Sequence, residues 1–236
     1  MNATSIKEQL QLLGNPEKAV HSAYFFKTGK GEYGEGDRFI GCTVPETRNV
    51  AKINRHTPVT ELAKLLGDEM HECRLCALII LVDQFKQADE SKRKEIVSFY
   101  LSQTTHINNW DLVDLSSYHI VGEWLKGKDD RRVIYRLAAS TLLWDQRIAV
   151  VSTMAFIRNN DFGDTLRLSE LFLTHKHDLM HKACGWMLRE VGKRDEKTLT
   201  GFLDRHHTAM PRTMLRYAIE RLSPEQKKKY MQRPQC

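Results

Sequence analysis

The sequence is poor in the residues that interrupt regular secondary structure. Its 236 residues include only 13 glycines and 6 prolines, fewer than globular proteins usually contain. This shortage favours long helices joined by few tight turns. Hydrophobic residues make up 41% and charged residues 28% of the chain, without a long Ser-, Gln- or Pro-rich tract, which is typical of a folded globular protein. We therefore expect an all-α protein with a single domain over residues 1–236.

Long hydrophobic runs are missing as well. The longest apolar stretch, Leu75 to Val82, is far shorter than the roughly 20 residues that cross a bilayer. The segment from Met1 to Leu13 lacks the apolar core of a secretory signal. The five cysteines are an odd set without the spacing of a disulfide framework, which favours a reducing compartment. These absences predict a cytoplasmic protein with no membrane span.

Patterns that bind nucleotides or metals are also absent. The one glycine-dense segment, Thr28–Cys42, has no GxxxxGK[ST] spacing and is predicted to be a loop between an amino-terminal helical pair and the rest of the chain. Cys73 and Cys76 have no second pair, and the histidines around His177 lack a completing carboxylate or thiol. We expect no metal site.

A repeated helical unit is the main positive signal. Similar segments begin 36, 37, 35 and 30 positions apart, at Arg74, Trp110, Arg147, Lys182 and Arg212. Each follows another helical stretch, such as Arg131–Leu143 or Thr165–Leu173. A helix pair of this length is typical of HEAT-like repeats. We therefore predict an α-α superhelix, or solenoid, of HEAT-like antiparallel helix pairs, with an irregular helical bundle as the alternative.

Two of the repeats carry unusual residues on a shared helical face. The first position is basic in four units and Trp110 in the fifth, and the residues one turn later include Asp114 and Trp186. If this face lines the concave side of a solenoid, one groove holds cations, two indoles and a carboxylate: Arg147, Lys182, Arg212, Trp110, Trp186 and Asp114. With a net charge of +6 and a pI of about 9.0, such a groove suits nucleic acid.

Asp114 is the residue in this set that needs a separate explanation, because phosphates repel a carboxylate. It either caps a helix or pairs with a neighbouring cation, or it stabilises positive charge on a sugar whose glycosidic bond is breaking. Trp110, one turn earlier, either fills the core or lies beside such a sugar. The sequence alone leaves both alternatives open.

Several ordered motifs resemble those of a known family. Asn15-Pro-Glu-Lys-Ala19 with Tyr24, then Trp110-Asp-Leu-Val-Asp114, Trp144-Asp-Gln-Arg147 and the run from Lys182 to Glu190 are similar to the successive motifs of the AlkD family of DNA alkylation repair glycosylases. The resemblance extends from about Asn15 to about Leu222. It implies a curved stack of helix pairs that holds duplex DNA on a basic face.

The resemblance also implies an activity and roles for individual residues. Members of the family hydrolyse the N-glycosidic bond of cationic N3- and N7-alkylated purines, such as 3-methyladenine and 7-methylguanine, without a metal or organic cofactor. By position, Asp114 corresponds to the catalytic aspartate, and the residues that contact the lesion or DNA correspond to Tyr24, Trp110, Arg147, Trp186, Lys182 and Arg189. We expect a monomer that acts in base excision repair in the cytoplasm, at the nucleoid. The alternative is a non-catalytic HEAT-like DNA-binding or scaffold protein, and the loop Thr28–Cys42 either contacts DNA or only connects helices.

Overall fold

The computed structural model describes residues 2–232, and in this range the chain is helical, without a strand. The predicted all-α fold class, built from packed helix pairs, is confirmed. The chain divides into two compact units, residues 1–120 and residues 121–236. That both units belong to one domain stays a prediction.

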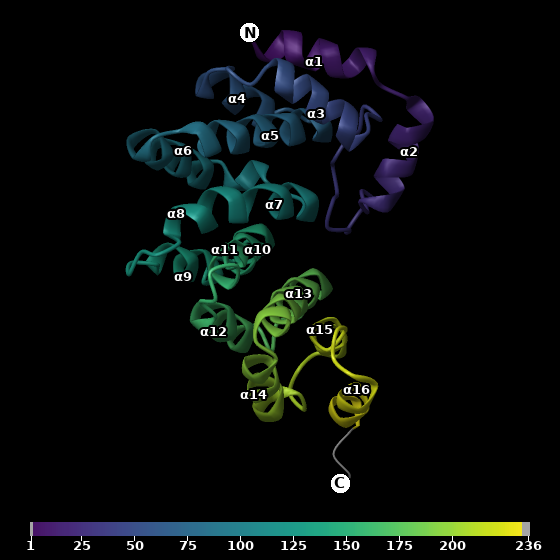
Figure 1. Ribbon diagram of the computed structural model, residues 1–236. Coiled ribbons are helices and arrows are strands. Elements are labelled where there is room, and N and C mark those ends of the chain that lie inside the picture. Colours follow the sequence, from purple (N-terminus) through teal and green to yellow (C-terminus); the bar gives the residue numbers. More distant parts are fainter. Residues whose placement is uncertain (1, 233–236) are drawn as a thin grey trace. The chain divides into compact units, whose positions relative to one another are not determined.

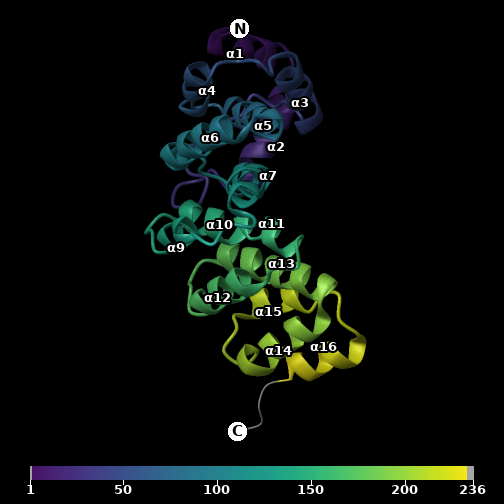
Figure 2. The same cartoon turned by 60° about the vertical axis from the view of Figure 1, so that its left-hand side comes forward.

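The first unit is built around one long helix, α5 (His71–Gln87; Figures 1 and 2), most of whose residues are buried. The central helix α5 packs against α3, α4, α6 and α7. All of its first twelve residues are buried, which explains the apolar run that the sequence shows there. The helices of this unit are α1 (Ala3–Leu12), α2 (Pro16–Phe25), α3 (Val44–Ile53), α4 (Val59–Leu66), α5 (His71–Gln87), α6 (Glu90–Ser102) and α7 (Trp110–Ser117), with a short 3-10 turn at Thr104–His106 before α7.

The second unit is organised around α13, which packs against α10, α11, α12, α14 and α15. A π-helical turn, Tyr118–Gly122, leads from α7 into this unit. Its helices are α8 (Glu123–Leu125), α9 (Arg132–Ala138), α10 (Leu143–Ser152), α11 (Met154–Ile157), α12 (Gly163–Leu171), α13 (Asp178–Arg194), α14 (Glu196–His206), α15 (Arg212–Ala218) and α16 (Pro224–Met231). None of the helices in the described part of the chain has the length and apolar character needed to cross a membrane.

Local sequence signals explain where several helices begin. The Thr43 side chain accepts a hydrogen bond from the backbone of Glu46, and the Glu46 carboxylate accepts one from the Thr43 backbone, which forms a capping box at the start of α3. Gly41, just before this cap, has a φ of 90°, and a Cβ there would lie 2.0 Å from the carbonyl oxygen of Asn15. A glycine is therefore required where this loop meets the start of α2.

The predicted helix positions need two corrections. All five repeat segments lie on helices, but only Trp110 and Arg212 begin one, whereas Arg74, Arg147 and Lys182 lie about one turn inside α5, α10 and α13. The prediction of one helix over Arg131–Leu143 was wrong, because α9 ends at Ala138 and α10 begins at Leu143. The Ser140 hydroxyl donates to Asp145 at 2.7 Å and accepts from the Leu142 backbone at 3.1 Å, which stabilises a turn between the two helices.

Candidate functional site

The start of α7 places two of the predicted site residues one helical turn apart. Asn109 is the N-cap, and its side-chain oxygen accepts a hydrogen bond from the Trp110 backbone at 2.8 Å. Trp110 and Asp114 are both half-buried, and their spacing puts them on the same face of the helix. Trp110 is therefore not fully enclosed in the core, and the α7 face that carries both side chains is partly open to solvent.

An aromatic cluster, composed of Phe25, Phe26, Phe39 and Trp110, forms around the indole. Phe26 stacks on Trp110 with 5.4 Å between ring centroids and on Phe39 at 5.2 Å. Phe25 meets Trp110 edge-on at 6.0 Å, and more than half of its side chain is exposed. Such offset and edge-on contacts stabilise ring pairs by about 0.5–1.5 kcal/mol each. The cluster fixes the orientation of Trp110 from one side.

A charge network, composed of Asp37, His71, Arg74 and Asp111, lies beside this cluster. His71 Nδ1 is 3.2 Å from Asp37 Oδ2, and His71 Nε2 is 2.8 Å from Asp111 Oδ2. Arg74 Nη2 donates to Asp37 Oδ1 at 2.6 Å. The His71 and Asp37 side chains are only 2% and 3% exposed. Four charged groups are thus held together within the interior of the first unit.

The buried position and the carboxylates act on the pKa of His71 in opposite directions. Burial lowers it, but the charge and hydrogen bond of Asp111, together with the hydrogen bond of Asp37, outweigh this effect and raise the pKa of His71 to about 9. For Asp37, burial raises the pKa, but the hydrogen bond from His71 and the charge of Arg74 lower it overall. His71 is therefore protonated and Asp37 ionised at neutral pH.

The loop Thr28–Cys42 contributes directly to this region, since it supplies Asp37 to the charge network and Phe39 to the aromatic cluster. The loop is held by Glu72, whose carboxylate accepts hydrogen bonds from the backbone N–H groups of Ile40 at 2.9 Å and Gly41 at 2.7 Å. The sequence-based prediction of a loop here is correct, and the loop does more than connect helices.

Tyr24 lies largely in solvent, whereas Phe25 and Phe26, which follow it, contact Trp110. Tyr24 is 76% exposed, and the Lys27 ammonium lies 5.1 Å from its ring centroid. The rings that contact Trp110 are those of Phe25 and Phe26. The aromatic role assigned to Tyr24 near the lesion therefore stays a prediction, and Phe25 and Phe26 are neighbours of Trp110 that the sequence motifs did not identify.

The remaining predicted site residues lie in the second unit. Arg147 is buried on α10, and its Nη1 donates to the carbonyl oxygen of Leu179 at 2.6 Å. On α13, Lys182 Nζ is 2.8 Å from Asp178 and its side chain is 40% exposed, whereas Arg189 forms ion pairs with Glu190 and Glu220. Trp186 is half-buried on the same helix. A groove shared by these residues and α7 stays a prediction.

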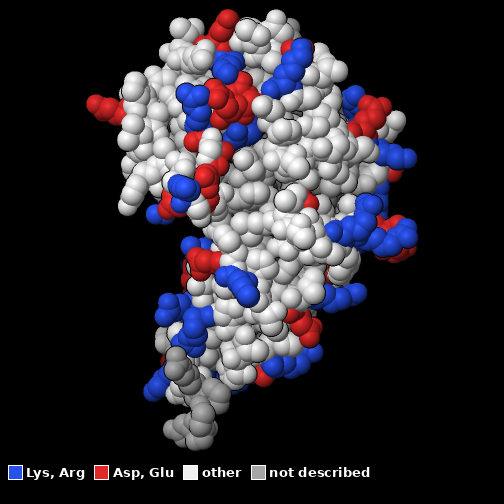
Figure 3. Space-filling model, turned by 180° about the vertical axis from the view of Figure 1, so that it is seen from behind, with Lys and Arg blue, Asp and Glu red and all other residues white. Residues whose placement is uncertain are grey.

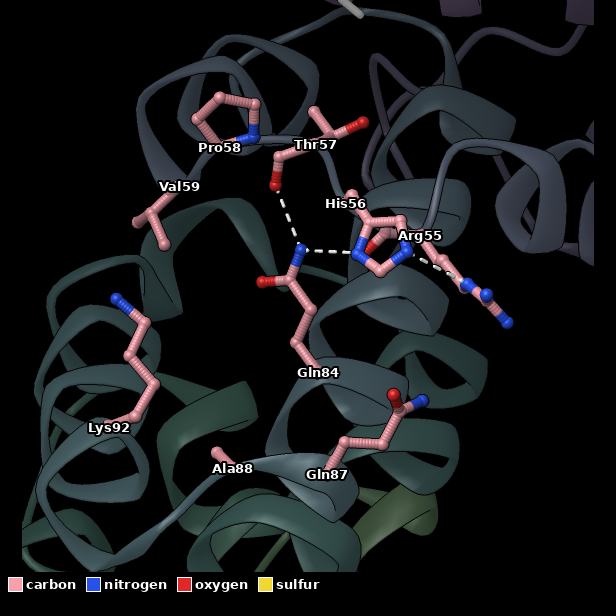
Figure 4. Close-up of a pocket in the computed structure, with 9 residues that line it drawn as sticks. All are labelled: Arg55, His56, Thr57, Pro58, Val59, Gln84, Gln87, Ala88 and Lys92. Carbon is pink, nitrogen blue, oxygen red and sulfur yellow. Dashed lines mark hydrogen bonds between the residues drawn. The ribbon is translucent and has the colours of Figure 1, made fainter.

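Two cavities in the first unit differ in what they offer. One of about 270 Å³ is lined by Phe26, Phe39, His71 and Asp111 among others, so it borders both the aromatic cluster and the charge network. The other, of about 350 Å³, is shown in Figure 4. There Gln84 Nε2 donates to the carbonyl oxygens of Arg55 and Thr57 at 2.9 and 2.8 Å, so its amide supports the loop before α4.

Comparisons with known proteins identify the family. The family model described as DNA alkylation repair enzyme matches residues 6–222. The chain belongs to the DNA alkylation repair enzyme family. A solved structure described as a predicted DNA alkylation repair enzyme from Enterococcus faecalis has a TM-score of 0.68 to this chain, with 15% identity, over 89% of this chain and 97% of that one. This likeness shows a common fold. No curated protein matches the chain.

Membership in the DNA alkylation repair family gives the chain a role in repairing alkylated DNA, with DNA as its substrate. On the face shown in Figure 3, most of the surface is uncharged, and several groups of Lys and Arg side chains lie next to Asp and Glu side chains, so this face is not uniformly basic. Among the described residues, no group of three or more His, Cys, Asp or Glu side chains is arranged to hold a metal ion.

Proposed function

We propose that the protein is a monofunctional DNA glycosylase that removes cationic N3- and N7-alkylated purines from duplex DNA. The observation that carries the proposal is the pairing of half-buried Asp114 with half-buried Trp110 on one face of α7, in a member of the DNA alkylation repair family. The aromatic cluster supports it further, because it holds Trp110 from behind while more than half of the Phe25 side chain remains exposed.

The chemistry requires few groups. An N-alkylated purine already carries a positive charge, so it departs without a general acid. When the bond between C1′ and the base nitrogen breaks, its electron pair stays on the base and cancels that charge. The sugar left behind resembles an oxocarbenium ion, which the Asp114 carboxylate stabilises. Water then adds to C1′ and releases its proton through Asp114 to solvent.

Aromatic rings suit this substrate because their faces attract cations. A good contact between an indole face and a positive charge contributes about 0.5–2 kcal/mol. Trp110 is assigned this role in the first unit and Trp186 in the second. Arg147, Lys182, Arg189 and Tyr24 are assigned to DNA contacts. Lys182 has the most exposed side chain of the three cations, at 40%, and is therefore the clearest candidate for a phosphate ligand.

The test is release of free 7-methylguanine from a methylated duplex, measured in single turnover and corrected for spontaneous loss from the duplex alone. We expect Asp114→Asn to lower the rate by at least about 100-fold, the scale seen when one stabilising group is removed from a transition state. Asp83→Asn, the same substitution at another half-buried position of the first unit, is the matched control and should leave the rate unchanged.

The outcomes separate the candidate functions. Equal rates for wild type and Asp114→Asn would remove Asp114 from the mechanism. No release by wild type, together with binding to the duplex, would favour a non-catalytic DNA-binding protein.

A further inference from the structure

His71 lies at a point where three parts of the first unit meet. It comes from α5, and its two ring nitrogens contact carboxylates from the loop before α3 and from α7. Its ring also lies 4.8 Å from the Phe39 ring and 5.0 Å from the Phe26 ring, centroid to centroid. One side chain therefore takes part in both the charge network and the aromatic cluster.

The hydrogen bonds of His71 require it to be protonated. A neutral imidazole has one N–H donor and one acceptor nitrogen, so one of the two carboxylates would face a lone pair. The imidazolium donates to both. It also balances the charges, because Asp37 and Asp111 then oppose His71 and Arg74. Loss of the proton would leave one uncompensated negative charge at a buried site, which is strongly unfavourable.

Lys18 and His21 of α2 line the same cavity as His71 but offer no carboxylate. The other charged groups of α5 near His71 are already engaged. Arg74, one turn along α5, donates to Asp37 and to the carbonyl oxygen of Asp68 at 2.9 Å. Glu72, the next residue on α5, accepts hydrogen bonds from the backbone N–H groups that hold the loop. The acceptors available to His71 are therefore Asp37 on the loop and Asp111 on α7.

These contacts converge on the first turn of α7. Asp111, which accepts from His71, follows Trp110 directly. Asn109, which caps the helix, donates from Nδ2 to Asp37 at 3.2 Å. Phe26 stacks on Trp110 and contacts the His71 ring at a tilted angle. The charge network thus fixes the residues on either side of Trp110, and Asp114 lies one turn further on the same helix.

We propose that protonated His71 is a positioning residue, which fixes the start of α7 and thereby aligns Trp110 and Asp114 for the excision of alkylated bases. The proposal rests on the proposed glycosylase function. His71 acts through Asp111 and Phe26, and it contributes no atom to the reaction itself.

The test uses a charge-balanced double variant. His71→Gln alone leaves a buried negative charge unpaired, so it lowers stability whatever its role. His71→Gln with Asp111→Asn removes one positive and one negative charge and keeps the Asp37–Arg74 ion pair. We expect the double variant to regain most of the stability that the single variant loses, but to release 7-methylguanine at least about tenfold more slowly than wild type. His106→Gln, at an exposed histidine of the same unit, is the control and should behave as wild type.

The pH profile gives a readout that a purely structural role would not produce. If only the protein with charged His71 is aligned, the single-turnover rate of wild type should fall as pH rises through about 9, approaching tenfold per pH unit above that value. The double variant should be slow and lack this alkaline decrease. Equal rates in wild type and double variant, or the same alkaline decrease in both, would overturn the positioning role.

A second measurement separates failure of this proposal from failure of the proposed function. The fluorescence difference between the protein and its Trp110→Phe variant isolates the emission of Trp110 without DNA. We expect this emission to change with a midpoint near pH 9, and the change to be absent in the double-variant background. If wild type releases no base, the glycosylase assignment fails, and a Trp110 emission that is constant from pH 7 to 10 independently contradicts the positioning role.

Discussion

At the scale of single residues, His71 should make the stability of the protein depend on pH. Its pKa is raised from 6.5 to about 9 in the folded protein, so the stabilisation is fully present below about pH 6.5 and is lost as pH rises through 9. A shift of this size corresponds to about 3 kcal/mol. Urea unfolding between pH 6 and 10 should show a falling free energy of unfolding for wild type and a flatter profile for His71→Gln with Asp111→Asn. Parallel profiles would exclude a charged His71.

The sequence motifs predict Trp110 and Asp114 as site residues, but they do not predict the groups that contact Trp110. Those two residues stand in a short motif on one helix, so their proximity follows from helical spacing. The partners of His71 are 34 and 40 positions away, and pairing at such separations depends on the tertiary fold. At two positions of the repeat, the basic first residue also makes a hydrogen bond inside the protein. Arg74 and Arg147 are buried and donate to the backbone carbonyls of Asp68 and Leu179.

At the scale of helices, Gly185 should be required for the close packing of α13 on α15. A Cβ at this position would lie 2.5 Å from the Met214 carbonyl oxygen and 2.5 Å from Tyr217 Cβ, so Gly185→Ala must push the helices apart. We expect it to lower the free energy of unfolding by about 1–3 kcal/mol. Gly201→Ala is the matched control, since a Cβ there meets no atom within 4 Å and should stabilise α14 by up to about 1 kcal/mol. Urea unfolding of wild type and both variants measures these differences. An equal loss of unfolding free energy in the two variants would contradict the packing argument.

Helix boundaries could be predicted only where the residues at the ends carry a signal. Thr43 and Glu46 form a capping box, and Ser223 with Gln226 forms another, so both starts follow from local sequence. The start of α5 at His71 has no side-chain cap. It is set instead by a contact distant in sequence, since the His71 backbone donates to the Arg38 carbonyl at 2.8 Å. A repeat counted from Arg74 therefore placed this helix correctly but missed its first turn.

At the scale of the whole molecule, the all-α fold class was predictable because it depends on properties summed over the chain: few glycines and prolines, and helical periodicity with a repeat of about 35 residues. The division into residues 1–120 and 121–236 was not predicted. The repeat continues through this boundary, since α7 lies before it and α10 after it. Sequence periodicity reports what successive helical repeats have in common. The division into two compact units depends instead on the number of contacts within each unit, which a repeat pattern does not contain.

The net charge of +6 predicts how the whole protein should bind duplex DNA. Affinity for damaged and undamaged duplex should fall with rising salt, because each neutralised phosphate releases a counterion and adds about 0.9 to the steepness of the fall of log K with log salt.

Lys182→Ala should weaken binding to both duplexes alike and reduce this slope by about 0.9, as expected for one lost phosphate contact. Lys64→Ala is the control, because Lys64 is also an exposed lysine in a helical ion pair, with Glu61, but no DNA contact is assigned to it. Fluorescence anisotropy between 50 and 200 mM salt measures both slopes. If Lys182→Ala leaves the slope unchanged, the ion pair with Asp178 holds the Lys182 ammonium away from DNA. If both variants reduce the slope equally, the effect comes from the net charge of the protein and not from a contact on α13.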